Sequence, residues 1–167
     1  IGSTLSECML KSVRSLEIGV CDFYMAKFDD MSESELLASI KVATDERIYA
    51  IAELMRRGVD AGIIYNRTKI DMFFLEKIKH IVEFEPVVKG APNDMEVLAD
   101  AKRMGFGDKF IAKLWGCKEI EVYNLRKEHN LFPVFKMVDT CHTGAYIPYF
   151  YSSYTGENAS VLTDKKK

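Results

Sequence analysis

Helix start and stop signals recur along the first 130 residues of this chain, and they constrain its fold more than any other feature. A start signal is a side chain that accepts hydrogen bonds from first-turn amides, often with a glutamate three residues later. A stop signal is a glycine that can adopt left-handed backbone. Between these signals, apolar residues recur three and four apart. Because no run of alternating strands intervenes, we predict an all-α, multihelical fold.

The signals predict about seven helices. Their expected spans run from Thr4 to about Ile18, from Ser32 past Ile40, from Thr44 to Arg57, from Thr68 to about Glu85, from Asn93 to Met104, from Asp108 to Trp115 and from about Lys118 to His129. Residues 19–31 are expected to be irregular and aromatic. From Leu131 through Tyr154 the pattern becomes extended and aromatic.

Helical periodicity also predicts which side chains face the core. The first helix is expected to bury Leu5, Met9, Val13 and Leu16. The fourth is expected to bury Phe74, Leu75, Ile78 and Val82, with Pro86 beyond its end because proline disrupts helix interiors.

Composition narrows the class of protein. The chain has 167 residues, of which 48% are apolar, and a formal charge of -2. Its length suits one domain, and the balanced charge argues against a nucleic-acid binder. No apolar run or leader pattern predicts a membrane span or a signal peptide, so we expect a cytoplasmic protein. Ile1 at the start and three lysines at the end indicate a piece of a longer protein.

We predict no catalytic, cofactor-binding or metal-binding residue in this chain. Phosphate-loop, dinucleotide, nucleophile-elbow and zinc-protease motifs are all absent from the sequence. Four scattered cysteines form no CxxC pair and are expected to be reduced thiols. Cys141 adjoins His142, but sequence neighbours rarely have the geometry of a catalytic pair.

Two other segments could suggest a catalytic site but have simpler structural explanations. The stretch from Gly105 to Gly107 lies between two predicted helices, where glycines are usual turn residues. Asp45 and Glu46 lie at a predicted helix start, where carboxylates favour the first-turn amides.

A helix-turn-helix nucleic-acid-binding domain is the alternative function. Residues 107–116 and 118–127 have the outline of that motif. Its second helix would begin with Glu119 and Glu121, which repel phosphates.

An aromatic strip near the end of the chain is the predicted interface. Its members are Tyr146, Tyr149, Phe150, Tyr151 and Tyr154. Aromatic-rich, charge-poor surface is typical of interface cores. The strip predicts self-association, most often as a two-fold dimer, unless it folds back over its own helices.

Several segments, taken in order, carry a family likeness. They are Ile1 to Glu17, Ala43 to Gly58, Ile70 to Ile78, Lys102 to Arg126, Pro133 to Cys141, and Tyr149 to Tyr154 with Glu157 and Asn158. Together they resemble the helical connecting and oligomerisation domain of carbamoyl-phosphate synthetase large subunits.

That resemblance implies a parent ligase with two ATP-using synthetase halves and an allosteric domain. Such an enzyme makes carbamoyl phosphate from bicarbonate, ATP and glutamine-derived ammonia, for arginine and pyrimidine biosynthesis. Its catalytic residues and its sites for ATP, magnesium or manganese, and potassium lie in the halves, so the resemblance implies none of them here. The implied partners are the flanking halves, other large subunits and the glutaminase small subunit.

The resemblance also implies a division of the chain. Residues 1–19 would be the closing helix of the preceding synthetase half, and residues 20–154 the connecting domain. Residues 155–167 would lead toward the second half.

Overall fold

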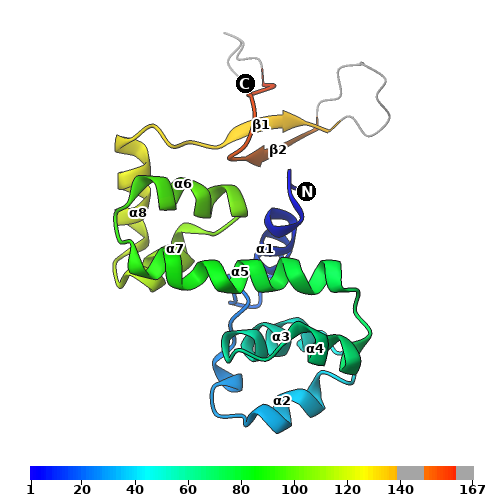
Figure 1. Ribbon diagram of the computed structural model, residues 1–167. Helices are drawn as coiled ribbons and strands as arrows, with labels where there is room; N and C mark the ends of the chain where they lie inside the picture. Colours follow the sequence, from blue (N-terminus) through cyan, green and yellow to red (C-terminus); the bar gives the residue numbers. More distant parts are fainter. Residues whose placement is uncertain (139–148, 161–167) are drawn as a thin grey trace.

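The computed structural model describes residues 1–138 and 149–160 (Figure 1). These residues form mainly α-helices, with one 3₁₀ helix and one pair of strands. In chain order the elements are α1 (Leu5–Ser15), η1 (Ala26–Phe28), α2 (Glu33–Ser39), α3 (Arg47–Arg56), α4 (Ala61–Thr68), α5 (Met72–Gly90), α6 (Met95–Met104), α7 (Asp108–Trp115), α8 (Glu119–Glu128), β1 (Val134–Met137) and β2 (Phe150–Ser153).

Helix α5, which has 19 residues, runs through the middle of the molecule (Figure 1). Helices α3 and α4 pack on it from one side, and α2 packs on α3. Helices α6 and α7 pack on it from the other side, α8 packs on α7, and α1 contacts α5 and α6. One buried cluster links both groups of helices, and it includes Leu36, Leu54, Leu75, Leu98 and Ile111.

Several start and stop signals act as predicted, and the all-α class is confirmed. The Ser32 hydroxyl accepts from the amide of Glu35, whose carboxylate accepts from the amide of Ser32. Helix α7 has the predicted bounds, and Gly116 after it has a φ of +69°. Asn130 follows α8 with a φ of +56°, so an asparagine ends this helix in the left-handed conformation that glycine often supplies.

The fourth predicted helix is wrong at both ends. Residues up to Thr68 form the separate helix α4, which was not predicted, and Lys69 closes it in left-handed backbone. Asp71 then caps α5, which continues through Pro86 as far as Gly90. Proline removes one backbone donor, but Glu85 and Val88 on either side of it are buried. Their packing therefore outweighs the local preference.

Two predicted caps move by one or two residues. Helix α3 begins after Glu46, without a side-chain cap, so Thr44 does not have the predicted role. Asp94, rather than Asn93, accepts from the first amides of α6. Asn93 has a φ of +63°, so it forms the turn that precedes the cap.

The buried face of α1 also differs from the prediction. Leu10 and Val13 are buried together with Glu7, whereas Leu16 is 58% exposed. Leu5 and Met9 are only half-buried. Compared with the predicted orientation, α1 is rotated so that Glu7 faces the interior, where its carboxylate binds the amide of Ser3 and the ammonium of Lys11.

The extended segment after α8 folds into an antiparallel hairpin. Strands β1 and β2 pair from Val134 with Ser153 to Met137 with Phe150. The hairpin lies beside the N-terminus (Figure 1). This small sheet was not predicted, because each strand has only four residues and its partner is distant in sequence.

Candidate junction and association surface

The buried carboxylate of Glu7 joins the start of the chain to the hairpin. Glu7 is 1% exposed. Its Oε2 accepts from the backbone amide of Ser3 at 2.6 Å and from the hydroxyl of Ser153 at 3.2 Å. Its Oε1 lies 2.9 Å from the ammonium of Lys11, one turn later on α1. Each carboxylate oxygen therefore has a partner, as a buried charge requires.

Lys11 extends this junction to the hairpin backbone. Its ammonium donates to the carbonyl oxygens of Ser152 and Ile1, and it lies 5.7 Å from the ring centroid of Tyr151. The hydroxyls of Ser3 and Ser153 are also 3.1 Å apart. Two segments separated by about the whole chain are thus held at one end of the molecule.

Gly105 brings helix α6 close to the same junction. A Cβ atom at this position would lie 2.8 Å from the Cα of Glu7. The carbonyl oxygen of Gly105 accepts a hydrogen bond from the guanidinium of Arg14 at 2.7 Å. Glycine is needed here because the φ is +99° and because the backbone of α1 lies so near.

A second, largely buried network holds Tyr154, the residue after β2, against α6, α7 and α8. Asp108 accepts from Lys102 at 2.8 Å and from the Nε of Arg126 at 3.1 Å. The guanidinium of Arg126 also donates to the hydroxyl of Tyr154 at 2.9 Å and to the carbonyl oxygen of Leu131 at 3.1 Å.

The charges in this network explain its pKa shifts. Burial raises the pKa of Asp108, but hydrogen bonds from Arg126 and the charge of Lys102 outweigh it, so the pKa is lowered overall. Burial lowers the pKa of Lys102, and Asp108 only partly offsets that effect. The network is a structural ion cluster, because every charged group in it is directed at another group of the protein.

A third ion cluster ties α3 to α5 and to the loop before η1. Arg56 binds both carboxylate oxygens of Glu85, at 2.7 and 2.8 Å. It also lies 3.3 Å from Glu53 and donates to the carbonyl oxygen of Phe23 at 2.9 Å.

The hairpin separates the members of the predicted aromatic interface strip. Tyr146 lies outside the described residues. Tyr149 is 59% exposed, whereas Phe150 and Tyr151 are half-buried in β2. Tyr154 is half-buried and accepts from Arg126. In the described chain, therefore, only Tyr149 of this strip has the exposure of an association residue.

A group of exposed apolar side chains, which we call the α4–α5 patch, lies on helices α4 and α5 near the turn between them. Its five members are large apolar side chains between 37% and 56% exposed: Ile63, Tyr65, Met72, Phe73 and Phe74. The rings of Phe73 and Phe74 pack edge to face with centroids 5.4 Å apart. Soluble domains rarely expose such a group of side chains unless something covers it.

Sequence reasoning missed this patch. It assigned both Phe74 and Leu75 to the buried stripe of their helix. Leu75 is buried as predicted, but Phe74 is 46% exposed. Two adjacent aromatic residues cannot both face the core from one helix, so the pair Phe73–Phe74 was the available signal.

The remaining candidate sites have structural roles or fall outside the description. Phe106, between Gly105 and Gly107, is a core residue that is 1% exposed. Glu46 pairs with Lys27. Cys141 and His142 lie outside the described residues.

The described residues also contain no group of three or more potential metal ligands. None of their helices is long and apolar enough to cross a membrane.

The helix-turn-helix alternative gains no support from the structure. Helices α7 and α8 do pack as a pair. However, Glu119 and Glu121 are exposed in the first turn of α8, and the carboxylate of Glu121 accepts from the amide of Lys118. A helix that presents carboxylates at its start is poorly suited to a phosphate backbone.

Comparison with known families identifies this arrangement. A family model described as "Carbamoyl-phosphate synthetase large chain, oligomerisation domain" matches residues 1–130. The match includes α1 to α8, the Glu7 end of the junction and the whole α4–α5 patch. The chain therefore belongs to the carbamoyl-phosphate synthetase large-chain oligomerisation domain family.

Proposed function

We propose that this chain is a non-catalytic connecting domain that associates with a second copy of itself through the α4–α5 patch. The observation that carries the proposal is the exposure of the patch, in which Phe73 is 56% and Phe74 46% exposed. Aromatic residues and methionine are enriched in interface cores. The family description supplies the partner, because an oligomerisation domain associates with other chains of its kind. Such contacts are most often two-fold symmetric.

The Glu7 junction supports the connecting role. A domain that joins two neighbours transmits their relative position only if its own entry and exit segments are fixed. Here Ser3 and Ser153 are both bound by one buried carboxylate. The junction would therefore hold the neighbours at the same end of a helical body.

The family also supports a wider proposal about the parent. The flanking synthetase halves and a glutaminase small subunit would be further partners in the cytoplasm. ATP, magnesium or manganese, and potassium would act in those halves to make carbamoyl phosphate. The chain itself would contribute position and association rather than chemistry.

Sedimentation equilibrium tests the association surface. Substitution Phe73→Asp places a charge in the centre of the patch without altering the core, so we expect dimerisation to weaken at least tenfold, or about 1.4 kcal/mol. Tyr149→Asp is the matched control, because Tyr149 is equally exposed but lies on the hairpin.

If Tyr149→Asp weakened dimerisation and Phe73→Asp did not, the aromatic strip rather than the α4–α5 patch would be the interface. A wild-type chain that stays monomeric at high micromolar concentration would remove the case for self-association altogether.

A further inference from the structure

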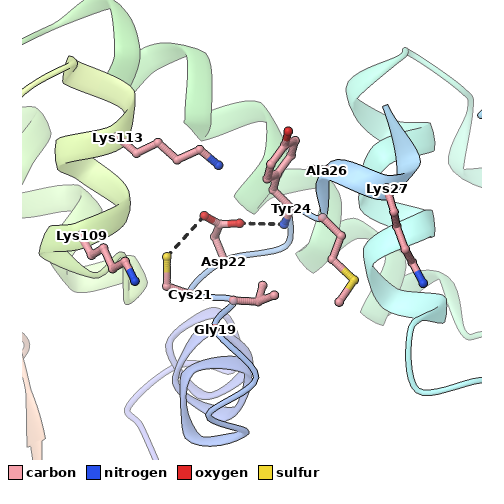
Figure 2. Close-up of a pocket in the computed structure, with 10 residues that line it drawn as sticks. Gly19, Cys21, Asp22, Tyr24, Ala26, Lys27, Lys109 and Lys113 are labelled. Carbon is pink, nitrogen blue, oxygen red and sulfur yellow. Dashed lines mark hydrogen bonds between the residues drawn. The ribbon is translucent and has the colours of Figure 1, made fainter. Parts of the chain in front are cut away.

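A cleft lies between the loop after α1 and the exposed side of α7 (Figure 2). Its volume is about 450 Å³, within the range of small-ligand sites. Val20 and Met25 are among the residues that line it and supply apolar wall. Lys109 and Lys113 of α7 also line it, and Figure 2 shows them across Asp22 from Lys27. The cleft is distinct from the junction and from the α4–α5 patch, so a ligand bound in it would be independent of the proposed function.

The floor of the cleft is held by a buried carboxylate. Asp22 is 3% exposed, and its Oδ1 accepts from the backbone amide of Tyr24 at 2.7 Å. The thiol of Cys21 donates to Oδ2 at 3.7 Å (Figure 2). Burial, followed by the charge of Asp22, raises the pKa of Cys21, so the thiol keeps the proton that it donates.

Two ammonium groups lie in the same cleft: Lys113 is close enough to lower the pKa of Asp22, and Lys109 to lower that of Cys21. In the described part of the chain, neither Lys109 nor Lys113 forms an ion pair, although both are close enough to influence the pKa of Cys21. The ammonium of Lys113 lies 3.7 Å from the ring centroid of Tyr24. The hydroxyl of that tyrosine donates to Asp29 at 2.6 Å, which fixes the ring. Lys113 is therefore preorganised at the mouth of the cleft.

The balance of charge and apolar surface defines the ligand. Lys27, the third lysine of the cleft, is already paired with Glu46. Two unpaired ammonium groups and one carboxylate leave a single positive charge unbalanced beside an apolar wall. We propose that the cleft binds a carboxylate group carried on a short apolar chain, with Lys109 and Lys113 as its ligands. The carboxylate belongs either to a small molecule or to an acidic side chain of a docking protein segment.

A phosphate fits this cleft less well. Lysine can bind phosphate, but well-formed phosphate sites usually add arginine forks or clusters of backbone amides. Here the donors are lysines, and Asp22 would repel a second negative charge. The apolar wall would also remain uncovered by an inorganic ion.

Titration of the full chain with hexanoate, followed through amide NMR signals, tests the proposal. We expect saturable shifts at Ala26 and Lys109, and none with hexanol, which lacks the charge. The double variant Lys109→Gln with Lys113→Gln should weaken hexanoate binding at least tenfold. Lys41→Gln is the matched control because Lys41 is exposed on a remote turn. The single variant Lys109→Gln, at an exposed position, repeats the test with minimal risk to folding.

A second arm distinguishes the source of the carboxylate. The capped peptide Leu-Glu-Leu is compared with Leu-Gln-Leu in the same titration. Binding of the glutamate peptide but not of hexanoate would assign the cleft to a docking segment, and binding of hexanoate alone to a small molecule. The proposal is overturned if neither probe binds, if hexanol binds equally well, or if the double variant binds as the native chain does.

Discussion

Both the backbone conformation and the helix packing at position 105 require glycine. Its φ is +99°, and an added Cβ would lie 2.8 Å from the Cα of Glu7. Gly58 has a similar φ of +83° but nothing within 4 Å of an added Cβ. We expect Gly58→Ala to lose about 1–2 kcal/mol of unfolding free energy from the left-handed backbone alone. Gly105→Ala should lose about 1–3 kcal/mol more, because α1 must move.

Urea denaturation of both glycine variants measures these losses. Equal losses at the two positions would show that the approach of α6 to Glu7 is looser than the structure has it.

The half-buried Asp108 and the buried Asp22 should give the stability of the protein opposite dependences on pH. The pKa of Asp108 is lowered overall, although burial opposes the shift, so its stabilisation is complete above the unfolded pKa, about 4, and is lost as pH falls through the folded pKa. The pKa of Asp22 is raised, chiefly by burial. Its destabilisation is therefore relieved as pH falls through the folded pKa, because the folded state takes up the proton first.

Substitution by asparagine separates the two aspartates. Asp108→Asn should lose about 3–5 kcal/mol at pH 7, since Lys102 and Arg126 are left without their carboxylate, and the loss should shrink in acid. Asp22→Asn should be most favourable, relative to the native chain, near neutral pH and less so in acid. Thermal unfolding between pH 3 and pH 7 checks both signs, and parallel curves for the native chain and both variants would contradict the assignment.

At the scale of elements, Pro86 shows packing overcoming local preference. It is exposed in the interior of α5, where its ring removes a backbone donor. We expect Pro86→Ala to raise the unfolding free energy by about 1 kcal/mol or more, because helix propensity improves by more than the unfolded chain gains in entropy.

Pro92→Ala is the matched control, since Pro92 lies in the turn before α6. Pro92→Ala should lower the unfolding free energy by about 0.4–1 kcal/mol, because the unfolded chain gains conformational entropy. Urea denaturation that gave the same sign for both prolines would contradict this explanation.

The elements that could be predicted are those whose limits are set locally. Helix α7 was predicted in full because Gly107 and Gly116 adjoin its ends. The extent of α5 could not be, since the burial that carries it past Pro86 comes from other helices. The pairing of Met137 with Phe150 likewise depends on contacts that no short window of sequence contains.

The candidate site shows the same division. An aromatic strip was visible in the sequence, but only the fold shows that Tyr154 is used internally, by Arg126. The amide of Glu7 binds the hydroxyl of Thr4, a local capping contact at the predicted helix start. Its carboxylate instead reaches Ser153, a partner 146 residues away that periodicity cannot reveal.

At the scale of the whole molecule, Glu7 decides whether the hairpin and the helices behave as one body. Glutamine at this position keeps the size of the side chain but replaces one acceptor by a donor. Lys11 or the amide of Ser3 then loses its partner, and we expect a loss of about 1–3 kcal/mol. The loss should be local, because the carboxylate of Glu7 binds Ser3 near the N-terminus, Lys11 on α1 and Ser153 in β2.

Native-state hydrogen exchange distinguishes a local from a global effect of Glu7→Gln. Amides of β2 should exchange faster, while those of α3 keep their protection. Glu83→Gln is the matched control, because Glu83 forms an exposed pair with Lys79 one turn apart on α5 and contributes at most about 0.5 kcal/mol. If protection fell equally in β2 and α3, Glu7 would be an ordinary core residue and the junction would have no separate role. Loosening confined to the hairpin would instead show that one buried carboxylate sets how firmly the exit segment is coupled to the helical body.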